Sequence, residues 1–174
     1  MELLTNKTKV AEVLQVAIGY NDAEFDVFIR EAQDFDLRPL LCEAFYADLI
    51  TNKEDGDIWQ LLLEGGTYTF ENRTYYFRSL QDVLAYFAYA RFILKCNYVS
   101  TSHGFTIKKT NYSEPVPLEE RKNMYYKYQK EAHILLDDVK RFVEKHTDDY
   151  PSYSGCKETS GKPHTGSFKT YIVK

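Results

Sequence analysis

The chain contains 174 residues, 44% of them apolar and 28% charged, which predicts one folded domain with a single core and excludes a chain that is disordered throughout. Its net charge of −4 excludes the overall basic character that binding to nucleic-acid phosphates requires. No apolar run approaches the ~20 residues that span a bilayer, so membrane insertion is not expected.

Aromatic content and an uneven charge distribution favour a protein that assembles with other chains. There are 15 tyrosines and 11 phenylalanines, and aromatic side chains with a polar tip suit surfaces that become covered on binding. A tyrosine-rich core whose hydroxyls reach the surface explains the same composition equally well. Residues 1–57 hold 13 acids and 5 bases, whereas residues 58–174 hold 13 acids and 17 bases. Opposite ends of neighbouring copies are therefore expected to attract each other.

The N-terminal third predicts helices. Residues 8–20 fit a short helix or a strand equally well. An Asn-Asp cap followed by acids predicts a helix from residue 21 to about 37. Pro39 disfavours continuation of that helix and opens another to about residue 52, so the two are expected to form an αα-hairpin. A short helix over 57–64 ends at two glycines.

The rest of the folded region alternates β segments with longer helices. Residues 67–77 predict a small hairpin, which needs a helix or a neighbouring copy to pack on. Ser79 caps a helix to about residue 98 that is apolar all round, as a central helix is. Residues 100–116 predict a loop or β-arm. The last helix, 117–146, has a heptad-like seam that packs along a neighbouring helix or belongs to the domain's own core.

An extended C-terminal arm is predicted over residues 148–174, because this segment lacks apolar periodicity. Its last eight residues regain β character and can add to a partner's sheet edge, unless the terminus is simply disordered. The predicted fold is mainly α: a bundle of four to five helices over residues 1–147, with the inserted hairpin and β-arm, followed by the tail. The expected protein-interface residues are Tyr75, Phe77, Phe105, Ile107, Tyr153, Phe168, Tyr171 and Ile172.

No catalytic, cofactor or metal site is predicted. Gly-rich phosphate loops, GxSxG elbows and HExxH helices are absent from the sequence. The nearest approaches to ligand pairs are Cys96 with His103 and Cys156 with His164, but a closed zinc site needs four ligands. The three cysteines, an odd number without a close pair, indicate a reducing compartment and argue against a disulfide framework. We therefore expect a protein that is not an enzyme.

Three stretches carry a resemblance to a known family: FIREAQDFDLRPLLCEAFYADL (28–49), RSLQDVLAYFAYARFI (78–93) and TSHGFTIKKTNYSEPV (101–116), the last followed by a long helix. With them the layout resembles the head-to-tail connector (adaptor) proteins of tailed bacteriophages. It is most similar to those of phages that infect Bacteroidetes hosts, including crAss-like phages. The resemblance covers about residues 20–150.

The resemblance implies a structural virion protein, assembled in the host cytoplasm. Such a chain is a subunit of a ring, commonly twelve-fold, that docks beneath the portal protein and contacts neighbouring connector or tail proteins. Double-stranded DNA passes through the lumen without specific binding, and the C-terminal arm engages the portal or an adjacent ring. In that setting Asp34 and Asp36 are expected to face the lumen and repel DNA. The alternative is a small non-enzymatic adaptor or assembly factor that binds one protein partner transiently.

Overall fold

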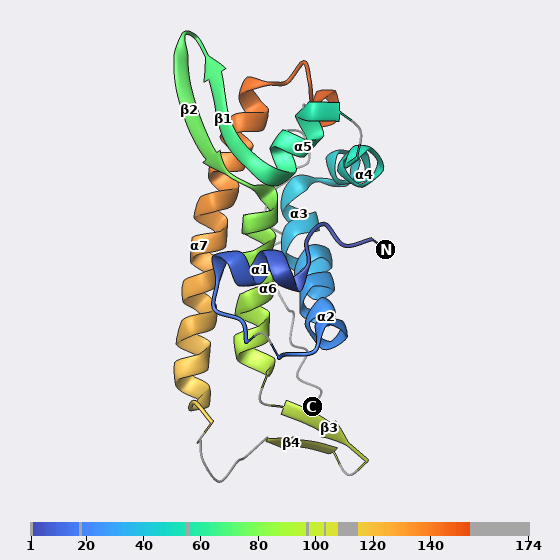
Figure 1. Ribbon diagram of the computed structural model, residues 1–174, viewed down its shortest axis with the longest axis vertical. Coiled ribbons are helices and arrows are strands. Elements are labelled where there is room, and N and C mark those ends of the chain that lie inside the picture. Colours follow the sequence, from blue (N-terminus) through green and yellow to red (C-terminus); the bar gives the residue numbers. More distant parts are fainter. Residues whose placement is uncertain are drawn as a thin grey trace, which may run out of the picture.

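The computed structural model of the chain is an elongated helical bundle with a β-hairpin beyond each end (Figure 1). Its central helix is α6 (Leu80–Lys95), and the longest, α7 (Leu118–Lys145), packs along it. The mostly helical architecture confirms the predicted fold class. The structure describes residues 2–17, 19–54, 56–96, 98–102, 104–107 and 115–153.

Helix α6 is the most buried element, as its sequence predicted. Its start is fixed by Ser79, whose hydroxyl accepts a hydrogen bond from the amide of Asp82 at 2.8 Å. The helix ends at Lys95 and not near residue 98, because a strand begins at Tyr98. Its buried side chains are those of Leu80, Val83, Leu84, Ala85, Phe87, Ala88, Tyr89, Ala90 and Ile93.

Two further helices, α1 (Lys7–Val13) and α2 (Asp22–Ala32), pack on α6. Each begins at an asparagine, Asn6 or Asn21, whose side chain accepts a hydrogen bond from the amide three residues later. For α1 this local signal settles the open choice between helix and strand. The predicted start of α2 is confirmed, and its buried face consists of Phe25, Phe28, Ile29 and Ala32.

The helix that begins with α2 does not stop before Pro39. It continues through a π-helical turn, η1 (Gln33–Leu37), into α3 (Arg38–Leu41). A proline ring in a regular α-helix clashes with the carbonyl four residues earlier, which here is that of Phe35. Because Phe35 lies within the wider π turn, the backbone passes the proline without a break.

The break comes at Cys42, whose φ of 57° ends α3 and starts α4 (Glu43–Asn52). Helix α4 crosses the upper end of the bundle instead of running back along α2 (Figure 1), so the predicted αα-hairpin is wrong. Cys42 also takes part in a disulfide bond, and the sequence argument against disulfides fails at this position.

Helix α5 (Gly56–Glu64) leads directly into the hairpin of β1 (Gly65–Phe70) and β2 (Arg73–Arg78). The strands are antiparallel, with Gly65 opposite Arg78 and Phe70 opposite Arg73. Gly65 has a φ of 75°, and a Cβ there would lie 2.6 Å from the amide nitrogen of Ser79, so the position requires glycine. The predicted hairpin and its helix stop are confirmed.

A second antiparallel pair, β3 (Tyr98–Thr101) and β4 (Gly104–Ile107), follows α6 at the other end of the bundle (Figure 1). It forms most of the described part of the segment that was predicted over residues 100–116 as a loop or β-arm. Position 103 and residues 108–114 of that segment lie outside the described residues.

Helix α7 spans the length of the bundle, and its apolar seam packs on α6 of the same chain. Of the two predicted roles for the seam, the domain's own core is therefore the one observed. The chain then folds back, burying Tyr150 and Tyr153, so the helical domain extends to residue 153 and not to 147. The remainder of the predicted arm lies outside the described residues.

No helix in the described part of the chain is long and apolar enough to cross a bilayer.

Candidate protein-interaction surfaces

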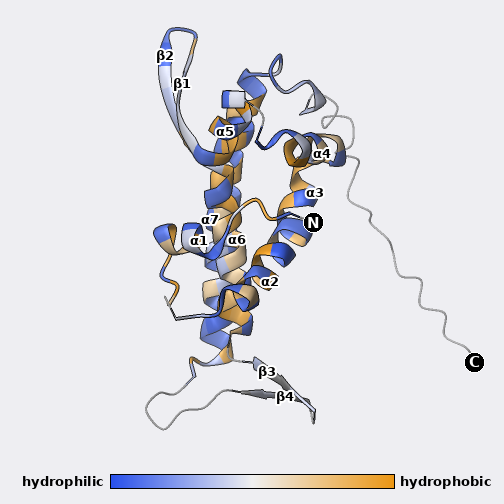
Figure 2. Cartoon of the chain, turned by 45° about the vertical axis from the view of Figure 1, so that its right-hand side comes forward, coloured by the Kyte–Doolittle hydropathy of each residue, from blue (hydrophilic) through white to orange (hydrophobic). Residues whose placement is uncertain are grey.

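The β1–β2 hairpin extends past the end of α7 (Figure 2). The side chains on one of its faces are packed and those on the other are exposed. On the packed face the ring of Phe77 stacks on that of Phe142, with centroids 4.2 Å apart and an interplanar angle of 10°. On the open face Tyr76 is 70% exposed. Within the described chain each strand pairs only with the other, so each keeps an edge that can accept a further strand.

Lys145 of α7 contacts the aromatic side chains on the packed face of the β1–β2 hairpin. The ammonium of Lys145 lies 3.4 Å from the ring centroid of Tyr75, and at 5.4 and 5.3 Å from those of Tyr68 and Phe70. It also donates a hydrogen bond to the hydroxyl of Tyr68 at 3.3 Å. Cation–π attraction of this kind adds to the packing at Phe77, so the hairpin is held against α7 from Phe77 near its base to Phe70 beside its turn.

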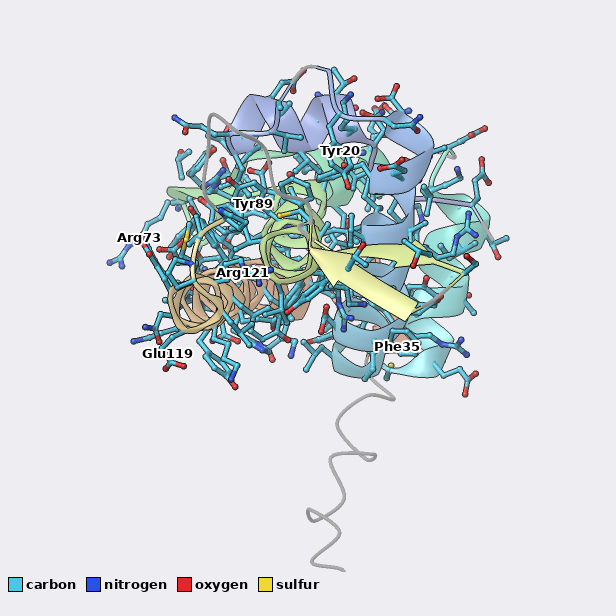
Figure 3. All side chains as sticks on the ribbon, turned by 90° about the horizontal axis from the view of Figure 1, so that it is seen from below. Tyr20, Phe35, Arg73, Tyr89, Glu119 and Arg121 are labelled. Atoms are coloured by element: carbon cyan, nitrogen blue, oxygen red, sulfur yellow. The ribbon has the colours of Figure 1, made fainter. Side chains whose placement is uncertain are left out.

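The β3–β4 hairpin is held at its base by Arg121 of α7, which is almost fully buried (Figure 3). Its guanidinium donates a hydrogen bond to the carbonyl of Leu94 at 2.8 Å and lies 5.1 Å from the ring centroid of Tyr98. The guanidinium thus satisfies a terminal carbonyl of α6 and complements the negative end of the helix dipole. The first residue of β3 is therefore fixed to both long helices.

Three of the predicted interface residues pack within the chain. Phe77 and Tyr153 are buried, and the ring of Tyr153 lies 5.2 Å from that of Phe45, so the prediction that these two form an interface is wrong. Tyr75 is half-buried against Lys145 and Tyr68. Large aromatic side chains bury the most apolar area, so they fill the core first.

The other predicted interface residues lie on β4 or beyond the described chain. Phe105 and Ile107 belong to β4, opposite Ser100 and Tyr98 in the register of the hairpin. Positions 168, 171 and 172 lie outside the described residues.

The two acids predicted to face a lumen differ in their surroundings. Asp36 is largely buried and accepts two hydrogen bonds from Arg91, at 2.5 and 3.0 Å. Burial alone lowers the pKa of Arg91, but these hydrogen bonds and the charges of Asp36 and Glu31 raise it above its usual value. The prediction that Asp36 is a solvent-facing charge is therefore wrong. Asp34 is half-buried at the surface of η1, so the prediction that it faces a lumen is not contradicted.

Comparison with known proteins places the chain in a family. Residues 37–162 match the model of a family of unknown function, DUF6712. The chain belongs to this family. No curated protein and no solved structure matches it.

In this DUF6712 protein the matched region begins at the end of η1 and includes α6, α7 and both described hairpins. The matched range therefore spans Arg121 and Lys145 of this chain. Helices α1 and α2 precede it.

A polar hollow of about 520 Å³ lies between the N-terminal segment and α5, beside Lys53 and Glu64. Lys53 is paired there with Glu2 and Glu54, at 2.7 and 3.7 Å. No three His, Cys, Asp or Glu side chains gather as metal ligands among the described residues. The projecting hairpins are therefore the stronger candidates for a functional surface.

Proposed function

We propose that this protein is a structural virion component, a head-to-tail connector (adaptor) ring subunit that docks on the portal protein and forms part of the DNA channel. The observation that carries the proposal is the position of the two described hairpins at opposite ends of one elongated bundle (Figures 1 and 2). A ring between a portal and a tail component needs an attachment at each end. The resemblance of the sequence to phage connectors supplies the kind of assembly.

The chemistry of the hairpins supports a docking role. Within the described residues each strand of β1–β2 pairs only with the other, so an outer edge of this hairpin can bind a partner by adding a strand to the sheet. The β1–β2 hairpin is held along its packed face by Lys145 and Phe142, and the base of β3–β4 is held by Arg121, so little conformational entropy is lost on binding. A preorganised edge of this kind suits a permanent assembly better than a transient encounter.

Passage of DNA through the ring is part of the same proposal. A lumen must not hold the duplex, and acidic side chains repel its phosphates. With Asp36 paired to Arg91, Asp34 is the acid that we assign to the channel.

The test is docking of the full chain to the portal protein of the same virus. We expect a large complex with several copies of the chain per portal, seen by mass measurement and by electron microscopy of the particle. The change Tyr76→Ser, on the open face of β1–β2, is expected to weaken docking, because it removes an exposed aromatic side chain. The matched control is Ile58→Ser, which removes an exposed apolar side chain of α5 at the same end of the molecule.

Docking that is equally strong in both variants would remove the role given to the β1–β2 hairpin. A chain that ignores the portal and binds one other protein transiently would instead support the adaptor or assembly-factor alternative.

A further inference from the structure

Two stretches of opposite charge lie on different helices of the bundle. Helix α2 carries four acids and one base between residues 22 and 32. Asp22 is paired with Lys7, and Glu31 with Arg91 and Lys95, so Glu24 and Asp26 are the acids that the inference uses. Residues 122–130 of α7 contain three lysines and no acid, a net charge of +3. Most of the charged side chains in the two stretches are exposed.

The outward side of α2 is set by its buried side. Since Phe25, Phe28 and Ile29 face the core, the helical period turns Val27 to solvent, where it is 51% exposed. Glu24 and Asp26 flank it along the same helix; Asp26 is half-buried and also lines the polar hollow, and the exposed Arg30 lies one turn further along the side of Val27. We call this surface the acidic face.

The outward side of α7 follows in the same way. Ala132, Leu136 and Val139 face α6, so Tyr126 and Ile134 turn away from the core, with exposed fractions of 67% and 53%. Lys127 and Lys130, both exposed, lie between them. We call this surface the basic face.

The two faces lie at the same level of the bundle, with α6 between them. Seen along the long axis, α2 and α7 flank α6 on separate sides (Figure 3). On one side the ring of Phe28 lies 5.8 Å from Phe92 of α6, and on the other the ring of Tyr128 lies 5.0 Å from Tyr89. Phe92 and Tyr89 are one helical turn apart.

We infer that the basic face of one copy packs against the acidic face of the next. This inference rests on the proposed ring and names the surfaces by which its subunits meet. Because the two faces differ, the contact is heterologous and repeats from copy to copy, as a ring requires. Val27, Tyr126 and Ile134 supply the apolar centre of the contact, and the charges fix its register.

The experiment uses full-length chains with reversed charges. One variant carries Lys127→Glu and Lys130→Glu, and the other carries Glu24→Lys and Asp26→Lys. In each, like charges meet across the contact, which weakens self-association at least about tenfold. An equimolar mixture restores it, because each altered face then meets a complementary one. Sedimentation velocity across a concentration series measures both effects, and circular dichroism establishes that each variant is folded.

The matched control is Lys9→Glu with Lys140→Glu, which makes the same change in net charge outside the basic face and leaves self-association unchanged. Three results would overturn the inference: a wild-type chain that stays monomeric throughout the series, single-face variants that associate like wild type, or a mixture that stays dissociated.

Failure of this inference can be told apart from failure of the proposed function. Portal docking with several copies, combined with unaffected variants, means that other surfaces join the subunits. Restored association in the mixture without portal docking means that the contact is real and the connector role is wrong. If Lys127→Glu with Lys130→Glu reduces only the retention of a duplex DNA probe, the lysines contact DNA and the inference fails.

Discussion

Tyr150 connects the C-terminal turn to the part of the bundle formed by α4 and α5. Its side chain is fully buried, with ring centroids 5.1 Å from Trp59 and 6.0 Å from Phe45. Its hydroxyl donates a hydrogen bond to the carbonyl of Ile58 at 2.8 Å. Burial disfavours the phenolate, so the pKa of Tyr150 lies well above its usual value of 10.0.

The change Tyr150→Phe is expected to lower the free energy of unfolding by about 0.5–1.5 kcal/mol at pH 7, because it removes the hydrogen bond from the hydroxyl to the carbonyl of Ile58. Above pH 10 the unfolded chain loses a proton that the folded chain keeps, so wild type loses stability as pH rises. The Tyr150→Phe variant has no phenolic proton at this position, so its stability does not change for this reason. The free energy of unfolding of wild type should therefore fall, relative to that of Tyr150→Phe, by about 1.4 kcal/mol per pH unit above pH 10.

Urea unfolding at pH 7 and between pH 10 and 11.5 measures this difference. A difference in free energy of unfolding that stays constant with pH would contradict burial of the Tyr150 hydroxyl.

Residues that meet distant partners were the ones that sequence reasoning missed. Tyr150 and Tyr153 stand in a polar segment with no periodicity, and they are buried only because α4 and α5 lie against them. The partner of Asp36 is Arg91, 55 residues away. Local pattern carries no information on such contacts, so an internal ion pair was predicted as a surface charge.

At the scale of elements, local chemistry was sufficient where a cap or a turn residue set the boundary. Asn21, Ser79 and Gly65 act through hydrogen bonds or backbone angles within a few residues, and the elements that they bound were predicted. Pro39 was misleading, because a π turn lets the helix continue through it. The break at Cys42 involves a positive φ in a residue that rarely adopts one, so no sequence rule indicates it.

The tip of β1–β2 offers a prediction about one element. Glu71 and Asn72 form a two-residue turn with φ values of 48° and 61°, the combination for which Asn-Gly is preferred. The double change Glu71→Asn with Asn72→Gly is expected to stabilise the protein by about 0.5–1 kcal/mol, since it relieves left-handed strain in the turn. The midpoint of urea unfolding measures the gain. The same pair of changes at Gln60 and Leu61, inside α5, should destabilise it.

A fall in stability on changing the tip would mean that the turn has another geometry.

At the scale of the whole molecule, truncation defines where the folded domain ends. A chain that ends at residue 153 or 162 is expected to unfold with the same midpoint as the full protein under reducing conditions. A chain that ends at 147 loses both buried tyrosines and is expected to be less stable by about 3–5 kcal/mol.

Thermal unfolding followed by circular dichroism tests the series, and equal midpoints for chains that end at 147 and 153 would contradict the role of the turn. The chain that ends at 162 also lacks residues 163–174, which include the eight residues whose sequence predicts β character. It is expected to fold normally and to lose docking to the portal.

The two described hairpins are joined directly by α6, with a single residue before the helix and a short link after it. Its 16 residues span about 24 Å. Since α7 packs along α6 and contacts both hairpins, an insertion in one helix shifts Lys145 or Arg121 out of reach of the hairpin that it holds. We therefore expect that members of the family differ in length at the hairpin tips, while insertions and deletions in α6 are matched by equal ones in α7.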